Sequence, residues 1–187
     1  WGREHHLARL HPGQRKRIRL LQKNVLEVRA SSMDVIAALN FSFCIFKRRA
    51  VLIEYLRRCR SALKHGGIMV MDIYGGPESH KPNRDKTRYQ GFIYVWDQAR
   101  FNPITNEALN HIHFHFPDGS KMTRAFTYDW RLWTPAELTE AMLEVGFKEA
   151  RVYWEGTTDD GRGNGIFRWQ RRAEVDDAWI VYVVGFR

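Results

Sequence analysis

Three histidines at every second position mark residues 111 to 116, which read HIHFHF. In an extended strand this spacing places the three imidazoles on one face and the apolar side chains between them on the other. Two neighbouring rings, roughly 7 Å apart, could share a metal, but three would converge only if the strand bends. We assign no metal here. His111 and His113 are candidate general bases, because an imidazole pKa near 6.5 suits proton transfer at neutral pH, and a solvated strand face is the plain alternative.

The segments on either side of these histidines alternate with the same period of two. Phe92, Tyr94 and Trp96 precede them, and residues 122–130 follow, with turn signals at Asn102-Pro103 and Pro117-Asp118-Gly119. This pattern predicts a three-stranded antiparallel meander, inserted at residues 77–130 and entered through a polar loop over 77–85.

The rest of the chain has the order expected of an α/β domain. Residues 2–10 read as the end of a helix, and residues 17–21 and 33–39 read as strands, the second one buried on both faces. A helix over residues 47–64 and a strand over 68–74 complete a βαβ unit. A capping box at Thr134 to Glu137 begins a helix that ends at Gly146, and two strands, 148–154 and 179–186, close the chain.

Composition limits the protein's class and setting. The chain has 187 residues, of which 44% are hydrophobic, which suits one globular domain. No run approaches the roughly 20 apolar residues that span a bilayer, so we expect no membrane partner. Cys44 and Cys59 lack metal-type or redox spacing and are read as buried or idle thiols, which favours a reducing, cytoplasmic setting. The net charge of +9 keeps RNA open as a partner, although solvated helix faces explain it equally well.

Two motifs in a fixed order carry a resemblance to a known family. The helix end and strand LKHGG-IMVMDIY, followed by WTPAEL and GF before two closing strands, resemble class I S-adenosylmethionine-dependent methyltransferases of the bacterial small-molecule type. The resemblance covers essentially all of residues 1–187 as a single, incomplete Rossmann-like domain. It implies that the first two strands are missing, with the Gly-rich loop that holds the methionine part of the cofactor and the acidic residue that binds its ribose. We therefore expect a fragment that is poorly stable, binds little cofactor and is inactive alone.

The resemblance also implies a modest set of cofactor contacts. Asn24 and Val25 match the position beside the adenine, although Asn24 is equally well explained as a turn residue. Ala38, Leu39 and Asn40 match the segment that lines the methyl-transfer site. Asn40 is the strongest single candidate for a catalytic role, with a helix cap or turn as its alternative. S-adenosylmethionine is the implied cofactor, and it carries the electrophile itself.

The insert is the expected substrate side. Aromatic side chains there could exclude water, and two arginines could pair with an anionic group, while the plain alternative is that several of them form the core of the insert. The substrate candidates are Tyr74, Tyr94, Trp96, Arg124, Tyr128, Trp130, Arg131 and Trp133. The segment Thr157 to Gly161 lacks the oxygen ligands of a calcium loop at their required spacing, so we expect a surface turn.

These observations predict in-line methyl transfer to a small-molecule acceptor. Nitrogen is slightly favoured over oxygen, because aromatic walls suit the ammonium that develops during the reaction. Three alternatives are kept: an RNA methyltransferase, a non-catalytic binding domain of the same fold, and a metal-dependent hydrolase. The sequence does not identify the acceptor or the oligomeric state.

Overall fold

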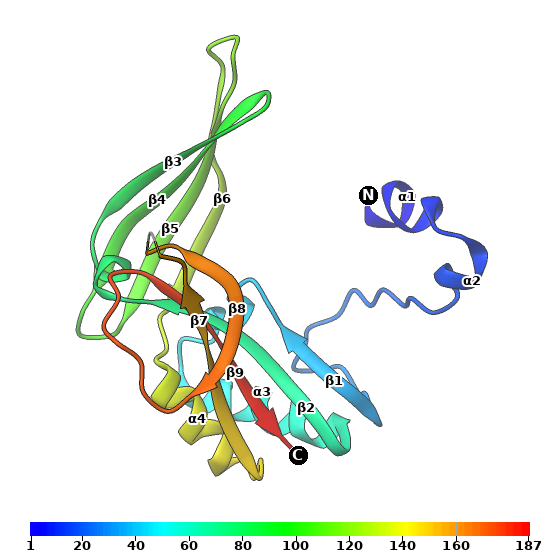
Figure 1. Cartoon of the computed structure of the whole chain (residues 1–187). Helices are drawn as coiled ribbons and strands as arrows, with labels where there is room; N and C mark the ends of the chain where they lie inside the picture. The colour runs from blue at the N-terminus through cyan, green and yellow to red at the C-terminus, as the bar shows by residue number, and fades with distance from the viewer. Residues whose placement is uncertain (160) are drawn as a thin grey trace.

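The computed structural model describes residues 1–159 and 161–187 and contains two β-sheets of different kinds. A five-stranded sheet has the order β1-β2-β9-β7-β8, and a four-stranded sheet has the order β3-β4-β5-β6. Figure 1 shows the four-stranded sheet extending from one end of the five-stranded sheet. Both sheets belong to an α/β fold, as the sequence predicts.

The five-stranded sheet is built around one parallel pair. Its strands are β1 (Met33–Ala38), β2 (Leu63–Gly75), β9 (Trp179–Phe186), β7 (Glu149–Thr157) and β8 (Gly163–Gln170). β1 and β2 are parallel and are joined through α3 (Arg49–Ala62), which confirms the predicted βαβ unit. β9 is antiparallel to both β2 and β7.

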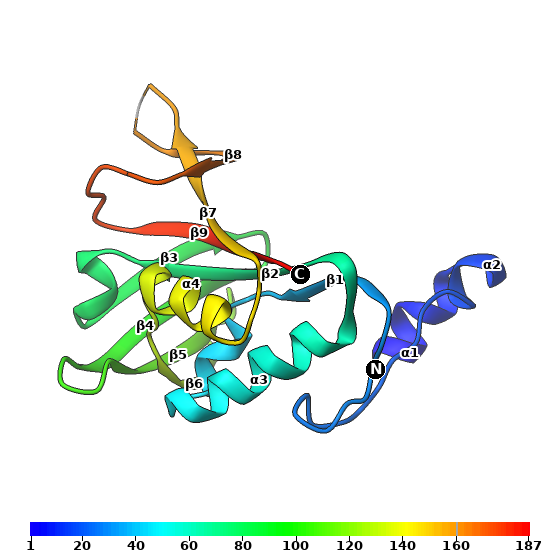
Figure 2. The same ribbon diagram turned by 90° about the horizontal axis from the view of Figure 1, so that it is seen from below.

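Two helices cover one face of this sheet (Figures 1 and 2). α3 places Leu52 and Leu56 fully in the core, as its apolar stripe predicts. α4 (Pro135–Glu144) begins with the predicted capping box, in which Thr134 and Glu137 exchange hydrogen bonds. The hydrophobic core lies between these helices and the central strands, whose residues Met69, Met71 and Val183 are fully buried.

The predicted meander has four strands instead of three. Its strands are β3 (Asn83–Tyr89), β4 (Phe92–Asn102), β5 (Glu107–His115) and β6 (Lys121–Arg131), all paired antiparallel. The predicted polar loop therefore contains only the short helix η3 (Pro77–His80) before β3 begins. β3 was missed because its sequence, NRDKTRY, has no apolar alternation. Its backbone pairs with β4, while its side chains are almost all exposed.

The N-terminal residues form short helices and irregular chain. They include α1 (Gly2–His5), η1 (Leu7–Arg9) and α2 (Pro12–Arg15). Pro12 begins α2, and does not end a helix as expected, because His11 caps it. The predicted strand over residues 17–21 is wrong. Ile18, Leu20 and Leu21 are each more than 40% exposed, and alternation specifies a strand only where a neighbouring strand and a core accept its two faces.

β1 is less buried than its apolar sequence predicts. It lies at the end of the five-stranded sheet, so only one of its backbone edges is paired. Val35 is 54% exposed and Met33 is 40% exposed. The prediction of a strand buried on both faces is therefore wrong for this chain. A second prediction also failed: β8 was missed, because the Gly- and Arg-rich stretch that forms it lacks strand-type alternation.

Among the described residues, no helix combines the length and apolar character needed to cross a membrane.

Candidate functional site

The carboxyl end of β1 has an unusual backbone that a buried carboxylate holds in place. Asn40 and Phe41 both have left-handed backbones, with φ of 57° and 55°. The N–H of Asn40 donates to Asp72 Oδ2 at 2.8 Å, and the N–H of Phe41 donates to Oδ1 at 2.9 Å. Asp72 lies on the adjacent strand β2 and is only 9% exposed. One carboxylate thus fixes the turn that presents Asn40 and Phe41 at this edge of the sheet.

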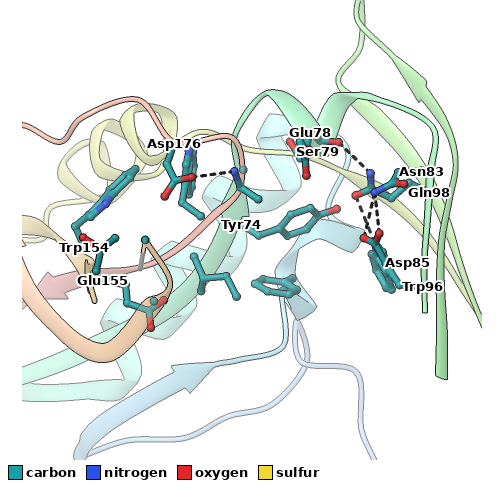
Figure 3. Close-up of a pocket in the computed structure, with 18 of the residues that line it drawn as sticks. Tyr74, Glu78, Ser79, Asn83, Asp85, Trp96, Gln98, Trp154, Glu155 and Asp176 are labelled. Atoms are coloured by element: carbon teal, nitrogen blue, oxygen red, sulfur yellow. Dashed lines mark hydrogen bonds between the residues drawn. The ribbon is translucent and has the colours of Figure 1, made fainter. Parts of the chain in front are cut away.

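A cavity of about 520 Å³ begins beside this turn and lies between the two sheets. Its size is that of a small-molecule site. Figure 3 shows Tyr74, at the end of β2, pointing into its middle. The lining comes from the ends of β1 and β2, from η3, from β3 and β4, from β7 and β8, and from the segment that leads into β9. The aromatic lining residues are Phe41, Tyr74, Tyr94, Trp96, Trp154 and Trp179.

The insert contributes one face of its sheet to this cavity. Tyr94 and Trp96 of β4 line it, as predicted for substrate contacts. Tyr128 and Trp130 lie behind them and stack on one another with ring centroids 4.4 Å apart. Trp130 is only 4% exposed and also contacts the rings of Phe41 and Tyr74. Tyr128 and Trp130 therefore support the aromatic wall, and neither lines the cavity.

Two loops close the cavity at the carboxyl end of β2. Gly76 has a φ of 101°, and a Cβ there would lie 2.3 Å from the carbonyl oxygen of Asp177. The N–H of Glu78 donates to that same carbonyl oxygen at 3.0 Å. The side chain of Gln98 then donates to the carbonyl oxygens of Glu78 and Lys81, which fastens η3 to the insert. The loop after β2 therefore bridges the two sheets.

Tyr74 contributes a half-buried hydroxyl to the middle of the site. Burial is the main cause that raises its pKa above the ordinary value, so the phenol is protonated at neutral pH. The side chain of Asn110 donates a hydrogen bond to the Tyr74 oxygen at 3.4 Å, and Asn110 itself is 2% exposed. Tyr74 can therefore offer its O–H to a ligand while Asn110 fixes its orientation.

The histidines of the HIHFHF strand lie on the opposite face of the insert sheet. Trp96 pairs with Ile112 across β4 and β5, so Ile112 shares the cavity-side face, and the histidines project from the other side. Neither His111 nor His113 lines the cavity. The packing role predicted for Ile112 is confirmed by its 8% exposure. His111 and His113 are only 5% and 9% exposed, so the solvated strand face expected as the alternative is wrong for these two residues. Both are buried on the face away from the cavity, and a role as a base stays a prediction.

His113 has a structural explanation of its own. Its Nδ1 accepts the backbone N–H of Arg124 at 3.0 Å, and its Nε2 lies 3.0 Å from Asp97 Oδ2. Arg124 has a left-handed φ of 51° and lies where the pairing of β5 and β6 shifts register. The imidazole therefore fills and caps a β-bulge, with both ring nitrogens in use. His111 contacts Thr127 Oγ1 through Nδ1 at 3.0 Å, and burial, followed by Arg124, lowers its pKa.

The predicted anion-binding arginines do not line the cavity. Arg131 lies over the ring of Trp133 at 3.7 Å, donates to Glu137 at 3.0 Å and donates to the carbonyl oxygen of Lys47 at 3.2 Å. Arg131 and Trp133 thus join the insert to α4 and the chain before α3. Arg124 contributes its backbone to the bulge described above. All three residues have structural contacts in place of the expected substrate contacts.

The residues predicted to contact the cofactor lie in three different places. Leu39, 46% exposed, and Asn40 present side chains at the end of β1. Ala38 is buried in the core. Asn24 and Val25 lie in the exposed N-terminal chain, where the Asn24 side chain accepts the N–H of Leu26 as in a turn. A contact between these two residues and a cofactor stays a prediction.

The metal-ligating side chains and the two cysteines of the described chain do not form a second reactive site. Among the described residues, no cluster of three or more His, Cys, Asp or Glu side chains has the arrangement of a metal site. Both cysteines are buried as predicted, and burial raises the pKa of Cys44 to about 12, so its thiol is not ionised at neutral pH. Asp160 of the predicted turn lies outside the described residues. Its neighbours Thr158 and Gly161 are exposed and joined by a backbone hydrogen bond.

Sequence reasoning missed most of the cavity. Trp154, Trp179 and four carboxylates line it without having been predicted: Glu78, Asp85, Glu155 and Asp176. The two tryptophans stack at 5.2 Å between β7 and β9. A signal was present in the sequence, since Trp154 ends one predicted strand and Trp179 begins the next. Their proximity depends on the antiparallel pairing of β7 and β9, which the sequence does not specify.

Comparison with solved structures places the fold. The chain superposes on the CcbJ methyltransferase from Streptomyces caelestis, with a TM-score of 0.61, 15% identity and coverage of 87% of this chain and 61% of that chain. It also superposes on an S-adenosylmethionine-dependent methyltransferase from Clostridium acetobutylicum, with a TM-score of 0.62 and 13% identity. This match covers 90% of this chain and 64% of that chain. For the amino pentose methyltransferase CalS10 from Micromonospora echinaspora, the TM-score is 0.57 and the identity is 15%. This match covers 88% of this chain and 63% of that chain.

These similarities show that the chain has the fold of S-adenosylmethionine-dependent methyltransferases, as the resemblance in the sequence implies. The chain spans less than two thirds of the length of these three structures. No protein-family model matches the sequence, and no curated protein matches it.

Proposed function

We propose that the chain serves S-adenosylmethionine-dependent methyl transfer to a small-molecule amine, which binds in the aromatic cavity between the two sheets. One observation carries this proposal: the cavity begins at Phe41 and Tyr74, where the parallel strands β1 and β2 end. In α/β folds, ligands bind in the crevice outside the carboxyl ends of such strands.

The residues at the end of β1 fit one wall of a cofactor site. Leu39 and Asn40 are exposed there, on a turn that Asp72 holds rigid. Leu39 offers an apolar surface, and the Asn40 side chain offers a donor and an acceptor. S-adenosylmethionine supplies, when bound, a methyl group activated by a sulfonium. Because the described residues provide only this wall, we expect the chain by itself to hold the cofactor weakly, with dissociation constants in the millimolar range.

The chain's residues then orient the acceptor. Transfer needs a neutral amine whose lone pair points at the methyl carbon in line with the bond that breaks. The nitrogen–carbon bond forms as the carbon–sulfur bond breaks, and the proton of the product ammonium leaves to water or to a cavity carboxylate. Tyr74, Tyr94 and Trp96 enclose the acceptor, and the Tyr74 O–H can donate to it. Aromatic faces favour the ammonium that develops, so nitrogen is preferred to oxygen.

Nuclear magnetic resonance tests the cofactor half of this proposal directly. S-adenosylhomocysteine, added in millimolar amounts to the labelled chain, is expected to shift the amide signals of Asn40 and Phe41. Asn40→Ala is expected to weaken the response, and Asn102→Ala is the matched control, since Asn102 lies outside the cavity and its side chain accepts the N–H of Ile104 in a turn. A response confined to other residues, or no response, would overturn the proposal in favour of a non-catalytic domain of this fold.

A further inference from the structure

The charge of the cavity is opposite to that of the chain. The sequence has 30 Lys and Arg residues and a net charge of +9. Among the described residues that line the cavity, however, four are carboxylates and none is Lys, Arg or His. Glu78, Asp85 and Asp176 are exposed and Glu155 is half-buried, so solvent screens each charge, but four like charges around one opening still attract ligands of the opposite sign. The cavity is therefore selective for cations in a protein whose remaining surface attracts anions.

Hydrogen bonds to uncharged groups hold three of these carboxylates, Glu155, Asp85 and Asp176. Glu155 accepts the N–H of Gly165 at 2.8 Å, and Asp85 accepts the side-chain amide of Asn83 at 3.1 Å. Within the described part of the chain, neither of them has a basic partner at ion-pair distance, and the same is true of Glu78 and Asp176. Acids elsewhere, such as Glu54 and Glu137, do form ion pairs with arginines. The negative charge of the cavity is thus left for a ligand to balance.

The carboxylates lie on both sides of the central tyrosine. Figure 3 shows Glu155 and Asp176 on the side of β7 and β9, and Asp85 and Glu78 on the side of the insert, with Tyr74 between the two pairs. A ligand with a single positive charge would satisfy one side only. A linear molecule with a cationic nitrogen at each end matches both sides.

The aromatic walls select the same kind of ligand. Trp154 lies on the side of Glu155 and Asp176, and Trp96 lies beside Asp85 (Figure 3). Trp179 also lines the cavity and contacts Trp154, with ring centroids 5.2 Å apart. Ring faces attract ammonium groups and also pack against the methylene chain that joins two amines. A phosphate has no cationic partner among the described lining residues, and the four carboxylates would repel it.

We infer that the acceptor is a free oligoamine: a flexible molecule with at least two amino groups and no phosphate. This inference rests on the proposed function, since it names the substrate class of the same cavity. One protonated amine is held by the carboxylates on one side of Tyr74, while another amine, in its neutral form, reaches the end of β1. Acceptors joined to a nucleoside diphosphate are excluded by charge.

Calorimetry on the whole chain without cofactor tests the inference, with the triamine spermidine and uridine diphosphate as probes. Spermidine is expected to bind and uridine diphosphate is not. The double substitution Asp85→Asn and Asp176→Asn, which removes one charge on each side of Tyr74, is expected to weaken spermidine binding about tenfold. Glu140→Gln removes an exposed charge on α4, outside the cavity, and is expected to leave the affinity unchanged. Raising the salt concentration on the unmodified chain is expected to weaken binding too, without any substitution.

Two results would overturn the inference: uridine diphosphate that binds as tightly as spermidine, or equal losses from the double substitution and from Glu140→Gln. Other results separate a failure of the proposed function from a failure of this inference. If spermidine binds but S-adenosylhomocysteine leaves Asn40 and Phe41 unaffected, the cavity is a cation site without methyl transfer. If those signals shift but spermidine does not bind, methyl transfer stands and the acceptor belongs to another class.

Discussion

The carboxylate of Asp72 offers the sharpest test of how the site is built. It accepts the N–H groups of Asn40 and Phe41 at 2.8 and 2.9 Å, and its side chain is buried. Asp72→Ala leaves both donors without an acceptor at the end of β1. Both bonds are partly buried, and a hydrogen bond to a charged group contributes about 1.5–3 kcal/mol. We therefore expect a loss of about 3 kcal/mol in the free energy of unfolding, which for a chain of this size lowers Tm by about 6–12 °C.

Thermal and urea unfolding measure this loss of stability, and two further variants serve as comparisons. Asp72→Asn keeps one acceptor oxygen but turns an N–H group toward the second backbone donor, so we expect about half of the effect or more. Asp34→Ala is the matched control. Asp34 also joins β1 to β2, through an exposed ion pair with Lys64, and such pairs contribute about 1 kcal/mol at most. If Asp72→Ala cost no more than Asp34→Ala, the reasoning about this turn would be refuted.

Three further predictions concern pH and the loops. Burial opposes the shift, but Arg84 and His113 lower the pKa of Asp97 below its ordinary value. The ionised Asp97 therefore stabilises the fold above an unfolded pKa near 4, and this stabilisation is lost as the pH falls through the lower folded pKa. In acid unfolding followed by circular dichroism, Asp97→Asn should remove this pH-dependent loss of stability. Burial lowers the pKa of His111, so the unfolded chain binds a proton on this imidazole more readily than the folded chain does. The free energy of unfolding should therefore decline as the pH falls below about 6.5. His111→Gln should reduce this decline, measured by urea unfolding at a series of pH values. Gly76→Ala should lower Tm by several degrees and weaken spermidine binding in calorimetry, because the added Cβ would meet the backbone of Asp177. Gly91 also has a positive φ, but a Cβ there would lie in open space, so Gly91→Ala should leave spermidine binding unchanged.

The sequence predicted the elements that have strong local signals. The apolar stripe of α3, the capping box of α4 and the alternation of β4 to β6 each place a segment correctly. The failures have a common cause, because tertiary pairing decided them. β3 and β8 are strands since a neighbour pairs with their backbones, and the apolar residues 17–21 are not a strand since no neighbour does.

The candidate site was predicted in part, for the same reason. Tyr74 lies near the end of β2, and Tyr94 and Trp96 lie on the face of β4 that faces the cavity, which brings the three together. The direction of the histidine face depends on the register between β4 and β5, which alternation alone leaves undecided. The carboxylates of the cavity come from four separate segments, and their convergence is visible only in the folded chain.

Methyl transfer itself is the most direct test of the central claim. The chain is incubated with millimolar S-adenosylmethionine that carries a deuterated methyl group, together with spermidine, and the amine is examined by mass spectrometry. Because millimolar cofactor partly compensates for weak binding, the account predicts that a small amount of label appears on nitrogen, in place of the inactivity expected from the sequence. It also predicts that Trp96→Ala reduces this amount relative to Glu140→Gln. An unlabelled amine, together with unchanged signals of Asn40 and Phe41 in the presence of S-adenosylhomocysteine, would contradict it.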